Sequence, residues 1–381
     1  MLYWLLALYS EYWFGIVVHT RIGQDFFIYY NAYANALSGG NPYLPYHIGE
    51  SFVNHPFVLS IVSLFAWHQD KISALLLWMG ASLVCLFVVI KCILDLAQTY
   101  LKKDVITNQK VLFSTGLAIL IGFGPFLETM HTGQINIFAL LSILLMYYYA
   151  ESNQPVLSGI FLSLAIALKT SPVIFVLYFL SLRNYRLLVS CALSFLLLGA
   201  IPTIQFSSDI IPSFLTFLSQ LGSEIHPSRN NHSILALATR VFPKIGLQGY
   251  DAMLTIGHKF AGLIVVGAML FPNVTVRPSQ SLRFCQFALL LLAMTLFSPL
   301  VWYHHSMFLI VPIVLLFLQD NNNYSIAGIA LILLIQLERL FENKVVNFPF
   351  PILVAHYVLL GLVLTIYVKT WSRHQAQYTM S

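Results

Sequence analysis

LLVSCALSFLLLGAIPTI, residues 187–204, is an apolar stretch without a charged side chain. A helix needs about 20 mostly apolar residues to cross the hydrocarbon core of a bilayer, so this stretch predicts a membrane-spanning helix. Arg183 and Arg186 directly precede it. Because basic residues collect in the cytoplasmic loops of membrane proteins, they also predict which end of the helix faces the cytoplasm.

The rest of the chain is built in the same way. Of its 381 residues, 59% are hydrophobic and 9% are charged, whereas about 25% of the residues in a soluble domain are charged. Further apolar runs cover 2–19, 72–98, 111–126, 135–150, 252–270, 284–298, 325–340 and 351–369, and shorter ones cover 57–67, 156–168, 171–181 and 306–318. We predict an all-α polytopic membrane protein with roughly eleven to thirteen membrane segments in one domain, residues 1–381.

The basic residues between these runs predict the topology. They form four groups: Lys102, Lys103 and Lys110; Arg183 and Arg186; Arg277 and Arg283; Lys369 and Arg373. Even numbers of runs separate the groups, so all four can be cytoplasmic, which places the 205–231 loop outside. Three runs precede Lys102. If all three cross the membrane and Lys102 is cytoplasmic, residues 20–50 are also cytoplasmic. They lie outside only if one of these assignments changes. Either 57–67 is re-entrant, which we favour because it is short, or 156–181 is one kinked span, which instead moves Lys102 outside.

Residues 23–37, GQDFFIYYNAYANAL, predict an amphipathic helix after the first span. Apolar residues recur at helical spacing on one face and polar residues lie on the other: Phe27, Tyr30, Ala34 and Leu37 against Asn31, Asn35 and Ser38. Gly39 and Gly40 end the helix. Asp25 stands at its N-cap or in its first turn. It either caps the helix or is a catalytic base at the membrane boundary.

Three further stretches gather polar residues at helix ends. They are ETMHTGQIN (128–136), ALKTSPVIF (167–175) and SPLVWYHHSMFLIVP (298–312). The last contains the adjacent His304 and His305, which are unusual beside two large aromatic residues. Lys169 lies between two short apolar runs, where it either snorkels to the interface or faces a cavity, a partner or an anionic ligand.

In this order the motifs resemble glycosyltransferase family 87, polytopic enzymes of the GT-C fold that use polyprenyl-phosphate sugars, including mannosyltransferases. The matching elements are Asp25 with Tyr30, Ala34 and GNPY (40–43); GQIN (133–136); ALKTSP (167–172); NHS (231–233) with Arg240; and SPLVWYHH (298–305). Each motif alone is weak, and the ordered set is more specific. The chain departs from the family in its short opening loop, which leaves the acceptor-binding part open.

The resemblance implies an inverting hexosyltransferase of the cell membrane with an extracytoplasmic site. Since nothing in the chain suggests eukaryotic targeting, we expect a bacterial plasma membrane. It would move mannose or another hexose from polyprenyl phosphate to a hydroxyl of a glycolipid or glycan. Asp25 would be the general base. The remaining roles are a phosphate contact for His304 or His305, with Lys169 and Arg240 as weaker candidates; hydrogen bonds to sugar or acceptor for Gln134, Asn136 and Asn231; and ring stacking, or an ordinary interfacial belt, for Tyr30, Tyr43 and Trp302.

Other functions and partners receive less support from the sequence. The outer loops hold no compact group of carboxylates, so we expect no metal and no cofactor, although Asp25, Glu128 and the histidines could converge in space. The chain lacks a GxGxxG or Walker-type loop, which argues against a soluble nucleotide-sugar donor, and its scattered basic residues argue against nucleic acid. Two rivals remain, an inactive scaffolding relative and a translocator of lipid-linked sugars. A translocator would be expected to show inverted repeats and a polar site at the bilayer midplane.

Overall fold

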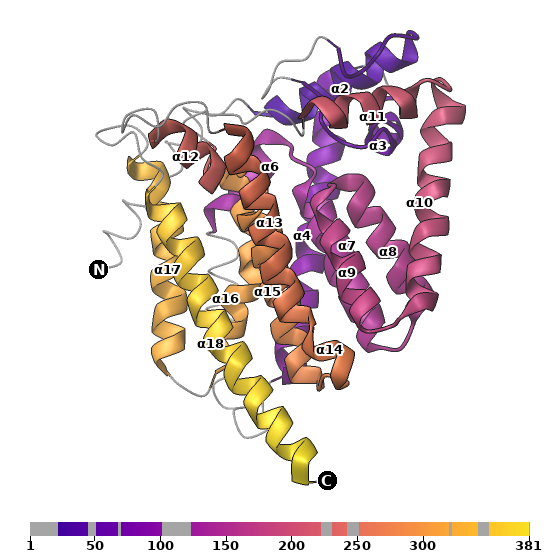
Figure 1. Ribbon diagram of the computed structural model, residues 1–381. Helices are drawn as coiled ribbons and strands as arrows, with labels where there is room; N and C mark the ends of the chain where they lie inside the picture. The colour runs from indigo at the N-terminus through magenta and orange to yellow at the C-terminus, as the bar shows by residue number, and fades with distance from the viewer. Residues whose placement is uncertain are drawn as a thin grey trace.

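The computed structural model describes residues 22–44, 51–67, 70–100, 123–221, 231–241, 251–319, 322–341 and 350–380. Within these ranges the regular elements are helices, with no strand among them (Figure 1). The α-helices are α2 (Gln24–Leu37), α3 (Phe57–Ala66), α4 (Lys71–Tyr100), α6 (Gly124–Thr132), α7 (Asn136–Glu151), α8 (Pro155–Leu168), α9 (Ile174–Ser181), α10 (Tyr185–Gln205), α11 (Ile210–Leu221), α12 (Ile234–Val241), α13 (Asp251–Leu270), α14 (Pro272–Thr275), α15 (Gln280–Leu296), α16 (Ile310–Phe317), α17 (Asn322–Phe341) and α18 (Phe350–Met380). Two 3-10 helices, η2 (Ser171–Val173) and η4 (Tyr303–Leu309), precede α9 and α16. The predicted all-α class is confirmed.

Four of these helices are long and apolar enough to cross a membrane. Their apolar segments are Lys71–Tyr100, Tyr185–Gln205, Met253–Val274 and Ile352–Ala376. Large apolar side chains such as Leu196, Phe260 and Val368 are exposed on them, as expected for surfaces that face lipid. The chain is therefore a polytopic helical membrane protein. The total of roughly eleven to thirteen segments stays a prediction, because the other apolar helices are shorter and 2–19 and most of 111–126 lie outside the described residues.

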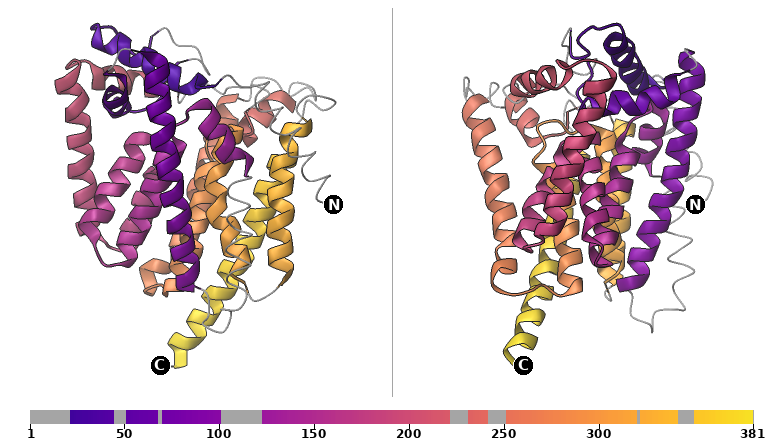
Figure 2. Two further views of the ribbon diagram at one scale, coloured as in Figure 1. Left: turned by 180° about the vertical axis from the view of Figure 1, so that it is seen from behind. Right: turned by 90° about the vertical axis from the view of Figure 1, so that its right-hand side faces the viewer.

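Short helices lie across one end of the bundle. In Figure 1, α2, α3 and α11 form a layer at the top, with α6 and α12 close to it, and the views in Figure 2 agree. We call this the upper end. The opposite, lower end carries α14 and the C-terminal part of α18 (Figure 1). The site described below lies toward the upper end, where α2, α6 and η4 meet.

The basic residues of the described loops lie at the lower end. Arg183, between α9 and α10, donates to the carbonyl of Val274 in α14 at 3.5 Å. His374 of α18 contacts the carbonyl of Arg277 at 3.0 Å. Three of the four predicted basic groups therefore share one end of the bundle, opposite α2. The fourth, Lys102, Lys103 and Lys110, lies outside the described residues.

The structure bears on both alternatives for the N-terminal topology. Helix α3 stays in the upper layer and does not cross the bundle (Figure 1), which supports the alternative that we favoured. The alternative of one kinked span over 156–181 is wrong. Ser190 of α10 donates to the carbonyl of Val156 at 2.9 Å, so α8 starts beside the helix that α9 leads into. Helices α8 and α9 thus run in opposite directions.

The face of α2 that packs on the protein differs from the predicted one. The buried residues are Phe26, Tyr29, Tyr30, Ala32 and Ala36. Of the predicted apolar face, only Tyr30 is buried, while Ala34 and Leu37 are exposed. The helix carries apolar residues on both sides, and periodicity alone does not distinguish a surface that meets protein from one that meets lipid.

Candidate active site

Asp25 lies in the first turn of α2 and does not cap it. The N-cap is Gly23, in the left-handed region with φ 70°, and no side chain caps the helix. The amide of Gly23 donates to the carbonyl of His131 at 2.8 Å, which joins the start of α2 to α6. Of the two alternatives for Asp25, the structure excludes the N-cap position, although the helix dipole still favours a carboxylate in the first turn.

The Asp25 carboxyl is partly buried and has polar neighbours from two segments. Burial raises its pKa, whereas His304 and hydrogen bonds from the side chains of Gln134 and Thr132 lower it; Glu128 raises it slightly. Gln134 in turn accepts a hydrogen bond from the Tyr29 hydroxyl at 2.9 Å. The GQIN motif therefore contacts Asp25 directly. The order of the motifs in the sequence did not predict this contact.

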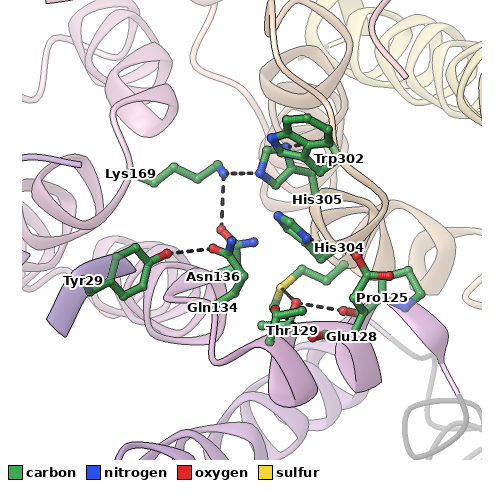
Figure 3. A network of polar contacts seen from close by, with 12 residues as sticks. Tyr29, Pro125, Glu128, Thr129, Gln134, Asn136, Lys169, Trp302, His304 and His305 are labelled. Atoms are coloured by element: carbon green, nitrogen blue, oxygen red, sulfur yellow. Dashed lines mark hydrogen bonds and ion pairs between the residues drawn. The ribbon is translucent and has the colours of Figure 1, made fainter. Parts of the chain in front are cut away.

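Lys169 joins two other motifs. Its Nζ lies 3.2 Å from Oδ1 of Asn136 and 2.8 Å from Nε2 of His305 (Figure 3). Asn136 is buried, and its Nδ2 has no hydrogen-bond partner within the described part of the chain. GQIN, ALKTSP and SPLVWYHH therefore meet at one lysine, which lies in the break between α8 and η2.

His305 links Lys169 to the backbone of the histidine segment. The amide of Trp302 donates to Nδ1 of His305 at 3.2 Å, and Nε2 of His305 lies 2.8 Å from Nζ of Lys169. Burial lowers the pKa of Lys169 to about 7, so both its neutral and its charged form are accessible near neutral pH.

His304 points in a different direction from His305. The two rings meet edge to face, with their centroids 4.7 Å apart. Nδ1 of His304 lies 3.3 Å from Oε1 of Glu128, and Nε2 is buried without a hydrogen-bond partner among the described residues. Sequence analysis allowed that Asp25, Glu128 and the histidines could converge in space. The contact between Glu128 and His304, across 176 positions, confirms this for that pair.

Asn231 and Arg240 support the histidine segment from outside the site. The Asn231 side chain donates to the carbonyl of Pro299 at 3.0 Å and accepts from the amide of Val301 at 2.9 Å. Arg240 donates to the Asn231 carbonyl at 3.2 Å. Asn231 is fully buried. Through these contacts Asn231 and Arg240 stabilise the segment that precedes the histidines. Their predicted contact with substrate stays a prediction.

The predicted aromatic residues are mostly packed against protein. Tyr43 is buried, stacks on Phe217 with centroids 5.2 Å apart and donates to the carbonyl of Asn54 at 3.0 Å. Tyr30 is buried beneath Lys71, whose Nζ lies 5.5 Å from the ring centroid. Trp302 is partly buried beside His305 (Figure 3). Stacking of any of them on a sugar stays a prediction.

The assembled site is a ring of carboxylate, imidazole, amide and amine groups from four segments. The Asp25 carboxyl has a raised pKa, and Lys169 and His305 form a contacting pair of nitrogen groups. In the described ranges no three His, Cys, Asp or Glu side chains gather closely enough to hold a metal ion. The arrangement suits proton removal from a hydroxyl beside an anion-binding position.

Comparison with known proteins gives one family. The family model of glycosyltransferase family 87 matches residues 52–301, more than half of the chain. The matched range contains Glu128, Gln134, Asn136 and Lys169. His304 and His305 lie directly after it, whereas Asp25 lies well before it. A search of curated proteins gave no match.

Proposed function

The chain belongs to glycosyltransferase family 87, and from this premise we propose that it transfers a hexose, mannose among the candidates, from polyprenyl phosphate to an acceptor hydroxyl. The acceptor is a glycolipid or glycan on the extracytoplasmic side of the cell membrane. The observation that carries the proposal is the proximity of the Asp25 carboxyl to His304 and Gln134, together with the neighbouring contact between Lys169 and His305.

Asp25 acts as the general base. Its carboxylate takes the proton of the acceptor hydroxyl as the oxygen forms a bond to the anomeric carbon of the donor. The bond from that carbon to the phosphate oxygen breaks, and its electron pair leaves with polyprenyl phosphate. Attack from the face opposite the phosphate inverts the anomeric centre. A positioned base of this kind contributes about 10²–10⁴-fold in rate.

Lys169, His305 and Asn136 bind the donor phosphate. The leaving group is already a stable anion, so cationic and hydrogen-bonding groups assist its departure more than a strong acid would. Lys169 becomes an ammonium when an anion lies beside it, because a nearby negative charge favours the charged form of an amine. The buried Nδ2 of Asn136, which has no partner within the described part of the chain, is a further donor for a sugar or phosphate oxygen.

The upper end of the bundle is extracytoplasmic in this proposal. The described basic loops lie at the lower end, and positive residues favour the cytoplasmic side. A lipid-linked sugar can then reach the site from the outer leaflet. No metal and no cofactor is assigned a step.

The decisive experiment replaces Asp25 by Asn. Purified protein in lipid nanodiscs is incubated with a panel of polyprenyl-phosphate sugars and candidate acceptors, with and without a chelator, and released polyprenyl phosphate is measured. We expect Asp25→Asn to lower transfer by at least about 100-fold, with normal membrane insertion, and the chelator to have no effect.

Asp70→Asn is the matched control. Asp70 is exposed and caps α4 by accepting from the amides of Ile72 and Ser73 on separate oxygens; asparagine retains one acceptor oxygen and is itself a favoured N-cap residue. Its substitution should leave transfer unchanged. A translocator or an inactive scaffold would retain its function in the Asp25→Asn protein, so undiminished function in that variant contradicts the proposal.

A further inference from the structure

Hydrogen bonds connect the GNPY motif to Lys169 through Asn54, a residue that belongs to none of the motifs. The Tyr43 hydroxyl donates to the carbonyl of Asn54 at 3.0 Å, and Nδ2 of Asn54 donates to the carbonyl of Leu168 at 2.9 Å. Leu168 directly precedes Lys169 in the ALKTSP motif. Asn54 therefore contacts the main chain at the point where the lysine side chain begins.

The peptide group between Leu168 and Lys169 is held on both sides. Helix α8 ends at Leu168, and Lys169 is its C-cap in an extended conformation, with φ −150° and ψ 127°. The carbonyl of this peptide accepts from Asn54, and its amide donates to the carbonyl of Ala165 at 2.9 Å. Because a peptide group is planar, these two bonds fix its orientation. They thereby determine the direction in which the Lys169 side chain leaves the backbone.

The bond from Asn54 also satisfies a carbonyl that needs a partner from outside its helix. The last carbonyls of an α-helix have no partner within the helix. Leu168 is only 2% exposed, and a buried carbonyl costs free energy when it lacks a donor. Loss of the Asn54 amide would therefore favour a rotation of this peptide toward another donor.

Asn54 is itself supported by the residues that follow it. His55 is buried, and its ring packs against those of Phe195 and Phe214, with centroids 5.1 and 5.2 Å apart. Its Nδ1 accepts from the amide of Phe57, at the start of α3, at 3.2 Å. The upper layer of helices thus gives Asn54 a fixed position from which to hold the end of α8.

Lys169 depends on this support because a lysine side chain is long and flexible. Its Nζ lies 3.2 Å from Oδ1 of Asn136 and 2.8 Å from Nε2 of His305 (Figure 3), and a rotation of the preceding peptide would move it away from both. We propose that Asn54 is a positioning residue, which holds the Leu168–Lys169 peptide so that the amine reaches the donor phosphate. The inference rests on the proposed function, in which Lys169 binds that phosphate.

Asn54→Leu tests this role, because leucine has nearly the same shape and cannot donate a hydrogen bond. Protein in nanodiscs is titrated with farnesyl phosphate and, separately, with farnesol, and empty nanodiscs give the background. The ratio of the two affinities measures what the phosphate contributes to binding. We expect this ratio to fall by about tenfold in Asn54→Leu, as for the loss of one hydrogen bond to a charged group, with the affinity for farnesol unchanged.

Ser190→Ala is the matched control. Ser190 also donates from its side chain to a carbonyl of α8, that of Val156 at 2.9 Å, but at the start of the helix. Its substitution should leave the ratio unchanged. In a Lys169→Gln background, Asn54→Leu should change the ratio by less than about twofold, since the amine that Asn54 positions is absent.

Two outcomes overturn the inference. One is a ratio for Asn54→Leu within about twofold of the wild-type ratio, which includes an equal weakening of both ligands by a loss of packing; the other is an equal loss with and without Lys169. Asn54→Ala gives the same comparison where the leucine variant does not fold. A wild-type protein that binds farnesyl phosphate no better than farnesol would instead contradict the phosphate role of Lys169. Undiminished transfer by Asp25→Asn would contradict the proposed function, so the failures are distinguishable.

Discussion

Burial shifts the pKa values of Asp25 and Lys169 in opposite directions. It raises the pKa of the Asp25 carboxyl and lowers the pKa of Lys169 to about 7. In both cases the charged form is disfavoured because the group leaves water. In the proposed reaction Asp25 needs its charge to remove a proton, and Lys169 needs its charge to hold a phosphate. Both are charged together only over a narrow range of pH.

We predict a bell-shaped pH dependence of kcat/KM. As pH rises through the raised pKa of Asp25, the carboxylate forms and the rate increases. As pH rises past about 7, free Lys169 loses its proton and donor capture declines. The pKa values that govern the pH dependence of kcat/KM are those of the free enzyme. Initial rates with a polyprenyl-phosphate sugar below its KM, from acid to alkaline pH, measure both sides.

Lys169→Gln is the variant that identifies the alkaline side. It should weaken donor capture and remove the decline above neutral pH, while the acid side remains where it was. An alkaline decline that persists in this variant would assign the titration to another group.

Single residues show which part of the site the sequence could supply. Asp25 and His304 were predicted from residue type and position at helix ends, and the structure places them together. Asn231 was expected to contact substrate, which stays a prediction; the structure adds that both polar atoms of its side-chain amide bond to protein. A polar side chain that binds backbone and one that binds ligand have the same appearance in a sequence, because the difference depends on what packs around it.

At the scale of helices, the position of Asp25 depends on how closely α2 approaches the turn after α6. Gly133 ends α6 in the left-handed region, with φ 72°. Its carbonyl accepts from Nε1 of Trp78 at 2.9 Å, and a Cβ at this position would lie 2.7 Å from Cβ of Phe26. The residue next to Asp25 thus packs directly on a glycine that has no room for a side chain.

Gly133→Ala is expected to displace α2 and lower transfer. The methyl group adds roughly 1–3 kcal/mol of steric destabilisation to about 1–2 kcal/mol of left-handed backbone strain. Because Phe26 must move, Asp25 moves with it, and kcat should fall in the protein that remains folded. Thermal stability and kcat are measured on the same nanodisc preparation.

Gly39→Ala separates the two contributions. Gly39 also has a positive φ, 81°, but nothing lies within 4 Å of its added Cβ. This variant should carry the backbone strain alone and keep the kcat of the wild type. Equal kcat for both variants would show that α2 does not move with Gly133.

The sequence predicted the positions of the helices better than it predicted which face of each helix packs on protein. The boundaries of α8 and α10 agree with the apolar runs at 156–168 and 187–204, since length and hydrophobicity determine where a membrane helix forms. The packed face of α2 was wrong. In a protein with lipid on its outside, apolar residues on a helix indicate either a protein neighbour or the bilayer.

At the scale of the whole molecule, the basic residues of the described loops lie at one end of the bundle and the site residues lie toward the other. The site residues belong to elements of the upper end, while Arg183, Arg277 and Arg283 lie at the lower end. Counting apolar runs between basic loops predicted this arrangement, because the charge of each loop limits which side it occupies. What the count did not supply was the convergence of α2, α6 and η4, which depends on packing between segments far apart in sequence.

The lower end also contains the ion pair that joins the two halves of the chain. Arg283 of α15 donates from Nε and Nη2 to the Glu151 carboxylate of α7, at 2.7 and 2.8 Å. Both side chains are largely buried, so Glu151→Gln leaves a guanidinium short of its counter-charge, at a cost of roughly 1–3 kcal/mol. We expect a lower melting temperature in nanodiscs, and unchanged kcat at temperatures well below it.

Asp95→Asn provides the comparison for this prediction. Asp95 pairs with Lys91 at 2.7 Å on the exposed surface of α4, where solvent already screens the charges and the loss of the pair should hardly change the melting temperature. If Glu151→Gln and Asp95→Asn have the same melting temperature, the buried pair between α7 and α15 does not stabilise the protein more than an exposed pair does. If instead kcat falls in Glu151→Gln while the melting temperature is retained, the ion pair at the lower end affects the site at the upper end. The prediction that this pair contributes only to stability would then be wrong.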